Sequence, residues 1–233
     1  MFEHMTNYSA PQRNPEVEQF ERRLSEALPE HIGQFIDGEP TILRESNADH
    51  MHLDVFIWSP TSDRPMWTMM TSGLSAHPMK VPAGAEYFER AELVLTLPEN
   101  WPAMPDILRM PESRAEEFLW PFFAMEHLAR MTYLYDIWLG YGHSTRACRT
   151  IDHTYPGSAF SGLLMEQVLS MPAEAATFKV QGHVVHCLGL YALYPLEVQF
   201  LLEEPHGSAH EMMHRFQDEG LHEGIIPGRP SLV

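Results

Sequence analysis

The segment from Met51 to Leu97 constrains the fold more than any other, because apolar and polar residues alternate in it over several short stretches. Alternation with a period of two places successive side chains on opposite faces of a strand. Strands are therefore predicted at 51–58, 67–71 and 91–97, with a shorter one at 41–44. Pro, Ser and Gly occupy the connections, so these strands are predicted to follow one another in one sheet.

The rest of the chain adds a buried strand and several helices. The continuous apolar run Val184–Leu193 is typical of a strand in the centre of a sheet. Asn14 is a favourable N-cap before Pro15, and apolar residues then recur every three or four positions, which predicts a helix. Closing helices are predicted at 196–203 and 208–219.

A helix is also predicted in the middle of the chain, because Ser113 and Glu116 have the spacing of a capping box. Pro121 is expected to break this helix, since proline lacks the backbone N–H and clashes with the preceding turn. Further strands are predicted at 163–168 and 176–180.

Together these elements predict an α/β fold of the α+β kind, with a central mixed, largely antiparallel β-sheet flanked by helices. Residues 1–13 are expected to form a flexible tail and residues 14–233 a single domain, because no repeat or linker divides the chain. The N-terminus lacks the apolar core of a signal peptide, so Cys148 and Cys187 are expected to be free thiols in a cytoplasmic protein.

The charge balance restricts the possible partners. The chain has 15 Lys and Arg against 32 Asp and Glu, a formal net charge of −17. Such a charge repels nucleic acid and anionic membranes, and it either favours a basic protein partner or only keeps the protein soluble. No apolar stretch approaches the roughly 20 residues of a membrane helix.

One group of residues has the spacing of a metal site. His50, His52 and Asp54 alternate along a predicted strand, so their side chains can share one face and hold zinc or non-haem iron. The same pattern also fits the polar face of an amphipathic strand. A metal-dependent enzyme is therefore the alternative function. Signatures of a nucleophile elbow, a phosphate-binding loop or a dinucleotide site do not occur in the sequence.

Charged residues within the predicted strands need partners if they are buried. His52, Asp54, Arg90 and Glu92 are predicted to form a structural polar network, in which Arg90 contacts Asp54 or Glu92. This interpretation gives the charges a role in folding rather than in catalysis.

Several short motifs occur in a specific order. They are Thr71-Ser72-Gly73-Leu74-Ser75, Pro78-Met79-Lys80-Val81-Pro82, Arg90-Ala91-Glu92-Leu93 and Tyr194-Pro195-Leu196-Glu197. Their order and spacing resemble those of the Suppressor of fused (SUFU) domain in its short, single-domain bacterial form. The resemblance covers roughly Asp54 to Glu197.

This resemblance implies a noncatalytic protein-binding module without metal or cofactor. Animal members sequester transcription factors, whereas for bacterial members the implied role is that of an immunity protein that neutralises a toxin by binding it. A basic toxin domain would be the corresponding partner of this acidic chain. The oligomeric state stays open.

The predicted partner-binding residues follow the motifs and the tryptophans. They are Asp54, Trp67, Thr71, Ser72, Met79, Trp101 and Trp120. A sheet edge that accepts an added strand provides a physical route to binding, and aromatic side chains often anchor such interfaces.

Overall fold

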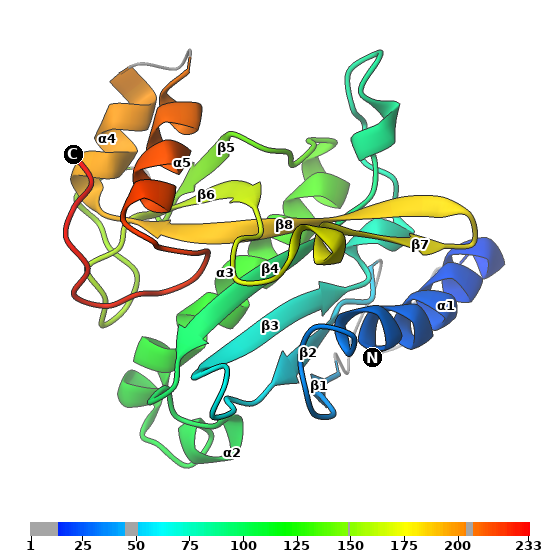
Figure 1. The fold of residues 1–233 in the computed structure, drawn as a ribbon, viewed down its shortest axis with the longest axis horizontal. Coiled ribbons are helices and arrows are strands. Elements are labelled where there is room, and N and C mark those ends of the chain that lie inside the picture. Colours follow the sequence, from blue (N-terminus) through cyan, green and yellow to red (C-terminus); the bar gives the residue numbers. More distant parts are fainter. Residues whose placement is uncertain (1–13, 45–50, 149, 204–206) are drawn as a thin grey trace, which may run out of the picture.

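A computed structural model describes residues 14–44, 51–148, 150–203 and 207–233 (Figure 1). The helices are α1 (Pro15–Ile32), α2 (Met104–Ile107), α3 (Glu112–Tyr135), α4 (Pro195–Glu203) and α5 (Ser208–Asp218). The strands are β1 (Thr41–Leu43), β2 (Asp54–Trp58), β3 (Met66–Ser72), β4 (Ala91–Pro98), β5 (His143–Arg146), β6 (Gly162–Gln167), β7 (Thr177–Val180) and β8 (His183–Leu193).

All eight strands belong to one sheet with the order β1-β2-β3-β4-β8-β6-β5, and β7 pairs with β8 beside this path. The pairs β1–β2, β2–β3 and β3–β4 are antiparallel, as are β5–β6, β6–β8 and β7–β8. Among the strand pairs of the described residues, β4–β8 alone is parallel, and an isolated parallel bridge joins Tyr191 to Gly224. The predicted mixed, largely antiparallel sheet is thus confirmed, as is the central position of the apolar strand β8.

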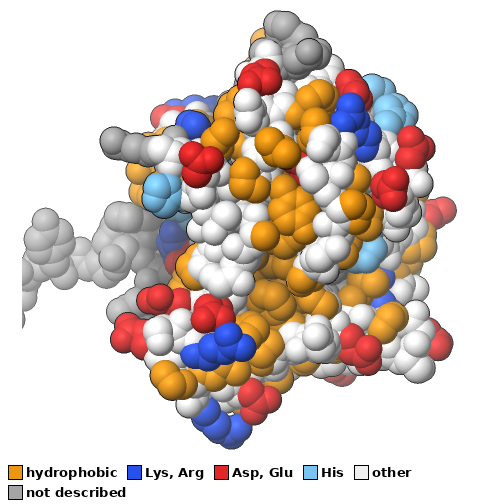
Figure 2. All heavy atoms as spheres, turned by 90° about the vertical axis from the view of Figure 1, so that its left-hand side faces the viewer, with side chains coloured by type: hydrophobic (Ala, Val, Ile, Leu, Met, Phe, Trp, Pro, Cys, Tyr) orange, Lys and Arg blue, Asp and Glu red, His pale blue; other side chains and the backbone are white. Residues whose placement is uncertain are grey.

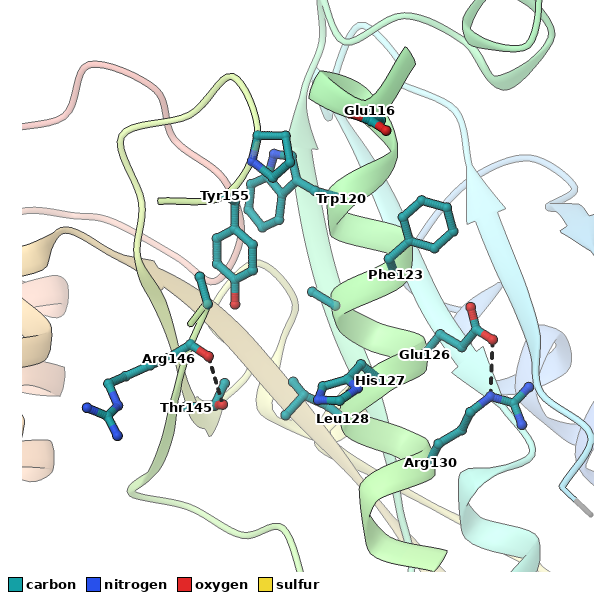
Figure 3. A pocket seen from close by; sticks show the side chains of 13 residues that line it. Glu116, Trp120, Phe123, Glu126, His127, Leu128, Arg130, Thr145, Arg146 and Tyr155 are labelled. Atoms are coloured by element: carbon teal, nitrogen blue, oxygen red, sulfur yellow. Dashed lines mark hydrogen bonds and ion pairs between the residues drawn. The ribbon is translucent and has the colours of Figure 1, made fainter. Parts of the chain in front are cut away.

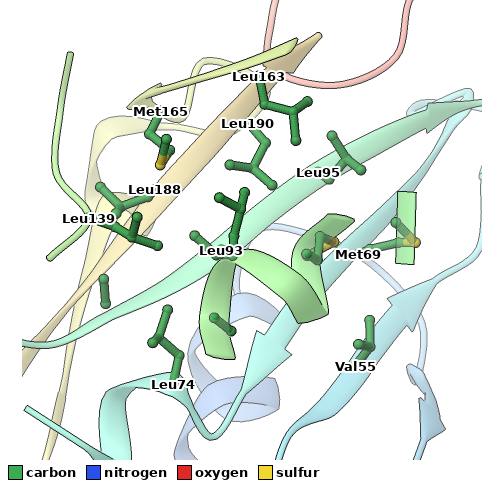
Figure 4. Packing of buried hydrophobic residues seen from close by; sticks show 14 of the residues in the cluster. Val55, Met69, Leu74, Leu93, Leu95, Leu139, Leu163, Met165, Leu188 and Leu190 are labelled. Carbon is green, nitrogen blue, oxygen red and sulfur yellow. The ribbon is translucent and has the colours of Figure 1, made fainter. Parts of the chain in front are cut away.

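Helices cover both faces of the sheet (Figure 1). Helix α3 packs on one face, where Leu93, Leu95, Met165 and Leu190 belong to the largest apolar cluster (Figure 4). Helix α1 covers part of the other face, over a second cluster. Helices α4 and α5 cover the remaining part, around Tyr191. Alternate strand residues therefore face two different cores, as the period of two requires.

The parallel strands β4 and β8 separate beyond their paired residues, and the C-terminal segment fills the gap. Gly224 N–H donates to Leu190 O at 2.7 Å, and Ile225 N–H donates to Thr96 O at 2.9 Å. Gly224 has φ 122°, and a Cβ there would lie 2.1 Å from Thr96 Oγ1. Glycine is therefore required for this close approach.

A buried ion pair fastens the rest of the C-terminal segment to the domain. Arg229 Nη2 lies 2.5 Å from Glu197 Oε2, and both side chains are almost fully buried. Glu197 also accepts from the backbone N–H groups of Tyr194 and Leu232. Buried charges are tolerated in a core when they are paired and hydrogen-bonded in this way.

Two expectations about α3 are wrong. The helix begins after Pro111 rather than at a capping box, and it continues through Pro121 to Tyr135. Trp120 and Pro121 are buried, so packing against the sheet stabilises the turn that proline weakens.

Helix α1 also continues past a proline, Pro29, and its Asn14 cap is confirmed by a 3.0 Å bond from Glu16 N–H. In the parts of the chain that the structure describes, no helix is long and apolar enough to cross a membrane.

Candidate functional site

A cavity of about 760 Å³ opens between helix α3 and strand β5 (Figure 3). We call it the α3/β5 groove. Trp120, His127 and Leu128 project from α3 towards β5 in this view, and Thr145 and Tyr155 lie opposite them. Ala124 contributes a small side chain to the lining. The groove is large enough for several residues of an extended peptide.

The topology places this groove beside an edge of the sheet. Strand β5 is the last in the strand order, so no other strand of the described residues pairs with its outer side. Its inner side pairs with β6 in the register Thr145↔Leu163. In an antiparallel ladder, the main-chain groups of alternate residues face away from the partner strand. An edge of this kind can accept an additional strand.

An aromatic pair forms one end of the groove. The rings of Trp120 and Tyr155 are stacked with centroids 4.2 Å apart and planes at 10°. Two backbone hydrogen bonds hold the loop that carries Tyr155. Tyr155 N–H donates to Phe160 O at 2.8 Å, and Ser158 N–H donates to Tyr155 O at 3.0 Å. The aromatic wall is therefore formed before any ligand binds.

The Tyr155 hydroxyl has no hydrogen-bond partner among the described residues, and it points into the space between α3 and β5 (Figure 3). Burial raises the pKa of this phenol, so it stays protonated at neutral pH. It can therefore donate a hydrogen bond to a ligand or accept one from it.

Charges of both signs surround the apolar lining. Glu126 and Arg130 form an ion pair at 3.1 Å on the side of α3 that faces away from β5 (Figure 3). Arg146 and Glu116 also line the cavity. An apolar floor with a mixed polar rim is typical of a surface that binds protein.

The motif residues have a different role, because they surround Glu92 in the interior. This side chain is fully buried and accepts from Thr71 Oγ1 at 2.6 Å, Ser75 Oγ at 2.6 Å, Ser75 N–H at 2.9 Å and Gly73 N–H at 3.1 Å. We call Glu92 and these three residues the Glu92 cradle. Burial raises the pKa of Glu92 to about 7, although the four donors act in the opposite direction.

Glycine is essential to the cradle. Gly73 has φ 137°, and a Cβ at this position would lie 2.0 Å from His52 O. Arg90 reaches the cradle through Ser75, because its Nη1 donates to Ser75 O at 2.5 Å, and its ion pair is with Glu89 at 3.7 Å rather than with Glu92. The Thr-Ser-Gly-Leu-Ser and Arg-Ala-Glu-Leu motifs are thus two parts of one buried arrangement.

His52 and Asp54 form a separate pair, with His52 Nε2 2.9 Å from Asp54 Oδ1. They line a smaller cavity of about 330 Å³ together with Ser72 and Arg44. His50, the third residue of the proposed metal triad, lies outside the described residues. Within the described part of the chain, no three His, Cys, Asp or Glu side chains are placed to hold a metal ion.

The structure separates the predicted partner-binding residues. Trp120 lines the α3/β5 groove, whereas Thr71 and Met79 are buried in the core. Trp101 packs edge-on against Phe118 at 5.4 Å, and Trp67 Nε1 donates to Glu99 O at 3.3 Å. Trp101 and Trp120 both border a third cavity of about 290 Å³. Asp54 and Ser72, as stated above, line the cavity beside β2.

Sequence reasoning missed most of the groove. His127, Thr145 and Tyr155 belong to no motif. One signal was available in the sequence, namely the helical spacing of α3. Exposed His127 and half-buried Ala124 lie next to buried positions of this helix. The approach of the loop that carries Tyr155 to α3 depends on tertiary structure.

Solved structures share this fold. A SUFU homologue from Neisseria gonorrhoeae FA 1090 matches with a TM-score of 0.61 and 15% identity over 93% of this chain and 98% of its own. A chain of the Sufu–Fu complex matches with a TM-score of 0.56 and 14% identity over 95% and 93%. Drosophila Suppressor of Fused matches with a TM-score of 0.52 and 14% identity over 90% of this chain and 51% of its own.

The family is shown by the sequence as well. The model of the Suppressor of fused protein (SUFU) family matches residues 49–230. The chain therefore belongs to the Suppressor of fused family, and the resemblance seen in its motifs is confirmed. Among curated proteins, no sequence matches significantly.

Proposed function

We propose that this protein is a noncatalytic binding domain that holds an extended segment of a partner protein in the α3/β5 groove. The observation that carries the proposal is the coincidence of an edge strand with a preformed, largely apolar cavity beside it. The main chain of the bound segment pairs with β5, and one of its large apolar side chains packs against Trp120 and Tyr155.

Family membership supports this proposal, and the surface has a further apolar area outside the lining of the groove. A structure that shares the fold is a Sufu–Fu complex, so a domain of this architecture occurs in a protein assembly. Hydrophobic side chains gather in the middle of the face over α4, α5 and the C-terminal segment, with charged groups around them (Figure 2). Apolar areas with polar rims are typical of interaction surfaces.

The binding proposal is tested with a library of random peptides displayed on phage. Selected peptides are synthesised, and their dissociation constants are measured by fluorescence anisotropy against the protein and two variants. Ala124→Arg places a long side chain in the groove, whereas Leu134→Arg makes the same change at an exposed position of α3 outside it. We expect Ala124→Arg to weaken binding at least tenfold and Leu134→Arg to leave it unchanged. Equal binding to all three proteins would refute the groove as the site.

Strand addition is tested separately through the peptide. Methylation of alternate backbone nitrogens removes main-chain donors but keeps the side chains. One of the two alternate methylation patterns should abolish binding, because only one set of N–H groups faces β5. If both patterns bind as well as the unmodified peptide, the segment does not pair with the edge.

We further propose that the partner is a basic toxin domain and that the protein acts as a cytoplasmic immunity protein. The support is the net charge of −17, which attracts a basic partner, and the match to a homologue from a bacterium. Neighbouring genes are expressed in a bacterial host with and without this protein. Growth inhibition by one of them, relieved by the protein but not by its Ala124→Arg variant, is expected. Absence of a toxic neighbour would overturn the immunity role and leave the groove proposal to its own test.

A further inference from the structure

Two histidines on α5 converge at the surface, away from the groove. His210 and His214 are one helical turn apart, and their Nε2 atoms lie 3.0 Å from each other. Both side chains are exposed, and their ring planes meet at 77°. In the metal-free protein, one N–H shared between the two nitrogens accounts for this short contact.

We propose that His210 and His214 form a binding site for a divalent transition-metal ion that accepts two adjacent imidazole ligands. Imidazole nitrogens bind such ions at about 2.1 Å. Two bonds of that length that span 3.0 Å meet at about 90°, which is the angle between neighbouring ligands in square-planar or octahedral coordination. The geometry therefore favours Ni(II) or Cu(II) over tetrahedral Zn(II).

The opposite face of the helix keeps this pair in place. Met212, Met213 and Phe216 are buried against the sheet, so α5 cannot rotate freely. The two ligands are therefore held in position before the ion arrives, which reduces the entropy lost on binding.

An acidic side chain contributes to the electrostatic field at the histidine pair. Glu166 lies near enough for the charge of His210 to lower its pKa, against the larger effect of burial, which raises it. Since the described residues offer no third side chain at ligand distance, water molecules complete the coordination. On binding, the ring that carries its proton on Nε2 releases this proton and takes one up on Nδ1, so both rings stay neutral and both Nε2 lone pairs bind the ion.

Calorimetric titration of the full chain with Ni(II) tests the proposal. The variants are His210→Ala, His214→Ala and the double variant, and the control is His183→Ala, which removes an exposed histidine elsewhere. We expect one site whose affinity falls at least tenfold in each single variant and is lost in the double variant, with no change in the control. A site that persists in the double variant would overturn the assignment.

Two further measurements test the coordination geometry and check that the double variant is folded. The electron paramagnetic resonance spectrum of the Cu(II) complex should show two equatorial nitrogens, reduced to one in each single variant. Saturating Ni(II) should raise the Tm of the protein but not that of the double variant, whose circular dichroism should match the wild type. Tighter binding of Zn(II) than of Ni(II) would contradict the predicted coordination.

Discussion

The Glu92 cradle and the α3/β5 groove lie in different parts of the same sheet and differ in almost every property. The cradle joins the ends of β3 and β4, is fully buried and satisfies a carboxylate with four donors. The groove lies beside the edge strand β5 and contains a hydroxyl without a partner among the described residues. The comparison teaches that the densest sequence motifs of this chain serve folding, whereas the open surface is built from residues outside them.

The largest effect is expected from removal of the cradle's acceptor. Glu92→Ala leaves the donors of Thr71, Gly73 and Ser75 unpaired in the core. Buried donors left without an acceptor cost about 1–3 kcal/mol each, so a loss of about 3–5 kcal/mol of unfolding free energy is expected. Urea denaturation at pH 5 measures this cost.

The matched control for this change is Glu174→Ala, at an exposed position, where about 0.5 kcal/mol or less is expected. If Glu92→Ala destabilised the protein no more than Glu174→Ala, the cradle would have no structural role. The contrast with the groove would then disappear.

The cradle, unlike the groove, should give the unfolding free energy a pH dependence of similar size. The pKa of Glu92 is about 7 in the folded protein, above its ordinary value of 4.5. The unfolded chain therefore loses this proton at lower pH than the folded chain, so the contribution of Glu92 is full below pH 4.5 and is lost as the pH rises to 7. The expected loss is on the order of 3 kcal/mol.

The pH prediction requires a variant in which this group does not titrate. Glu92→Gln should lack the decrease in unfolding free energy between pH 4.5 and 7 that other carboxyl and histidine groups do not explain. Urea midpoints at both pH values, compared between wild type and Glu92→Gln, give the difference. Identical pH profiles would mean that Glu92 has the same pKa in both states.

A substitution in the groove should have the opposite effect to one in the cradle, because it should weaken peptide binding and leave the stability of the fold unchanged. Ala124→Arg should change the unfolding free energy by less than about 0.5 kcal/mol, because Arg is a good helix former and the site is open. Binding of a selected peptide should weaken by about 2 kcal/mol, as is typical at an interface hot spot. A variant that unfolds more easily than Leu134→Arg would show that the groove is part of the core.

The sequence predicts the sheet well because alternation and apolar runs are local signals. The strand β8 and the helix α1 with its Asn14 cap needed no knowledge of tertiary contacts. The course of α3 through Pro121 could not be predicted, because it depends on burial of Trp120 and Pro121 against strands distant in sequence.

The candidate site was harder to predict for the same reason. The sequence predicts Thr71 as a partner-binding residue and Glu92 as part of a polar network, but only the fold shows that one donates to the other. Tyr155 reaches the groove from a loop that follows β5, and no local pattern indicates that it stacks on Trp120. Residues that a loop and a helix bring together show no periodic pattern in the sequence.

The smallest expected effect tests the groove at a single atom. Tyr155→Phe removes the hydroxyl and keeps the ring that stacks on Trp120. Since this hydroxyl has no partner among the described residues, the unfolding free energy should stay within about 0.5 kcal/mol of wild type. Peptide binding should weaken by about 1 kcal/mol, the net contribution of one hydrogen bond, when measured by calorimetry. The control is Tyr133→Phe on the exposed end of α3, outside the groove. If Tyr155→Phe left binding unchanged, the hydroxyl would have no role in recognition, and the groove would act through its apolar walls and the strand edge alone.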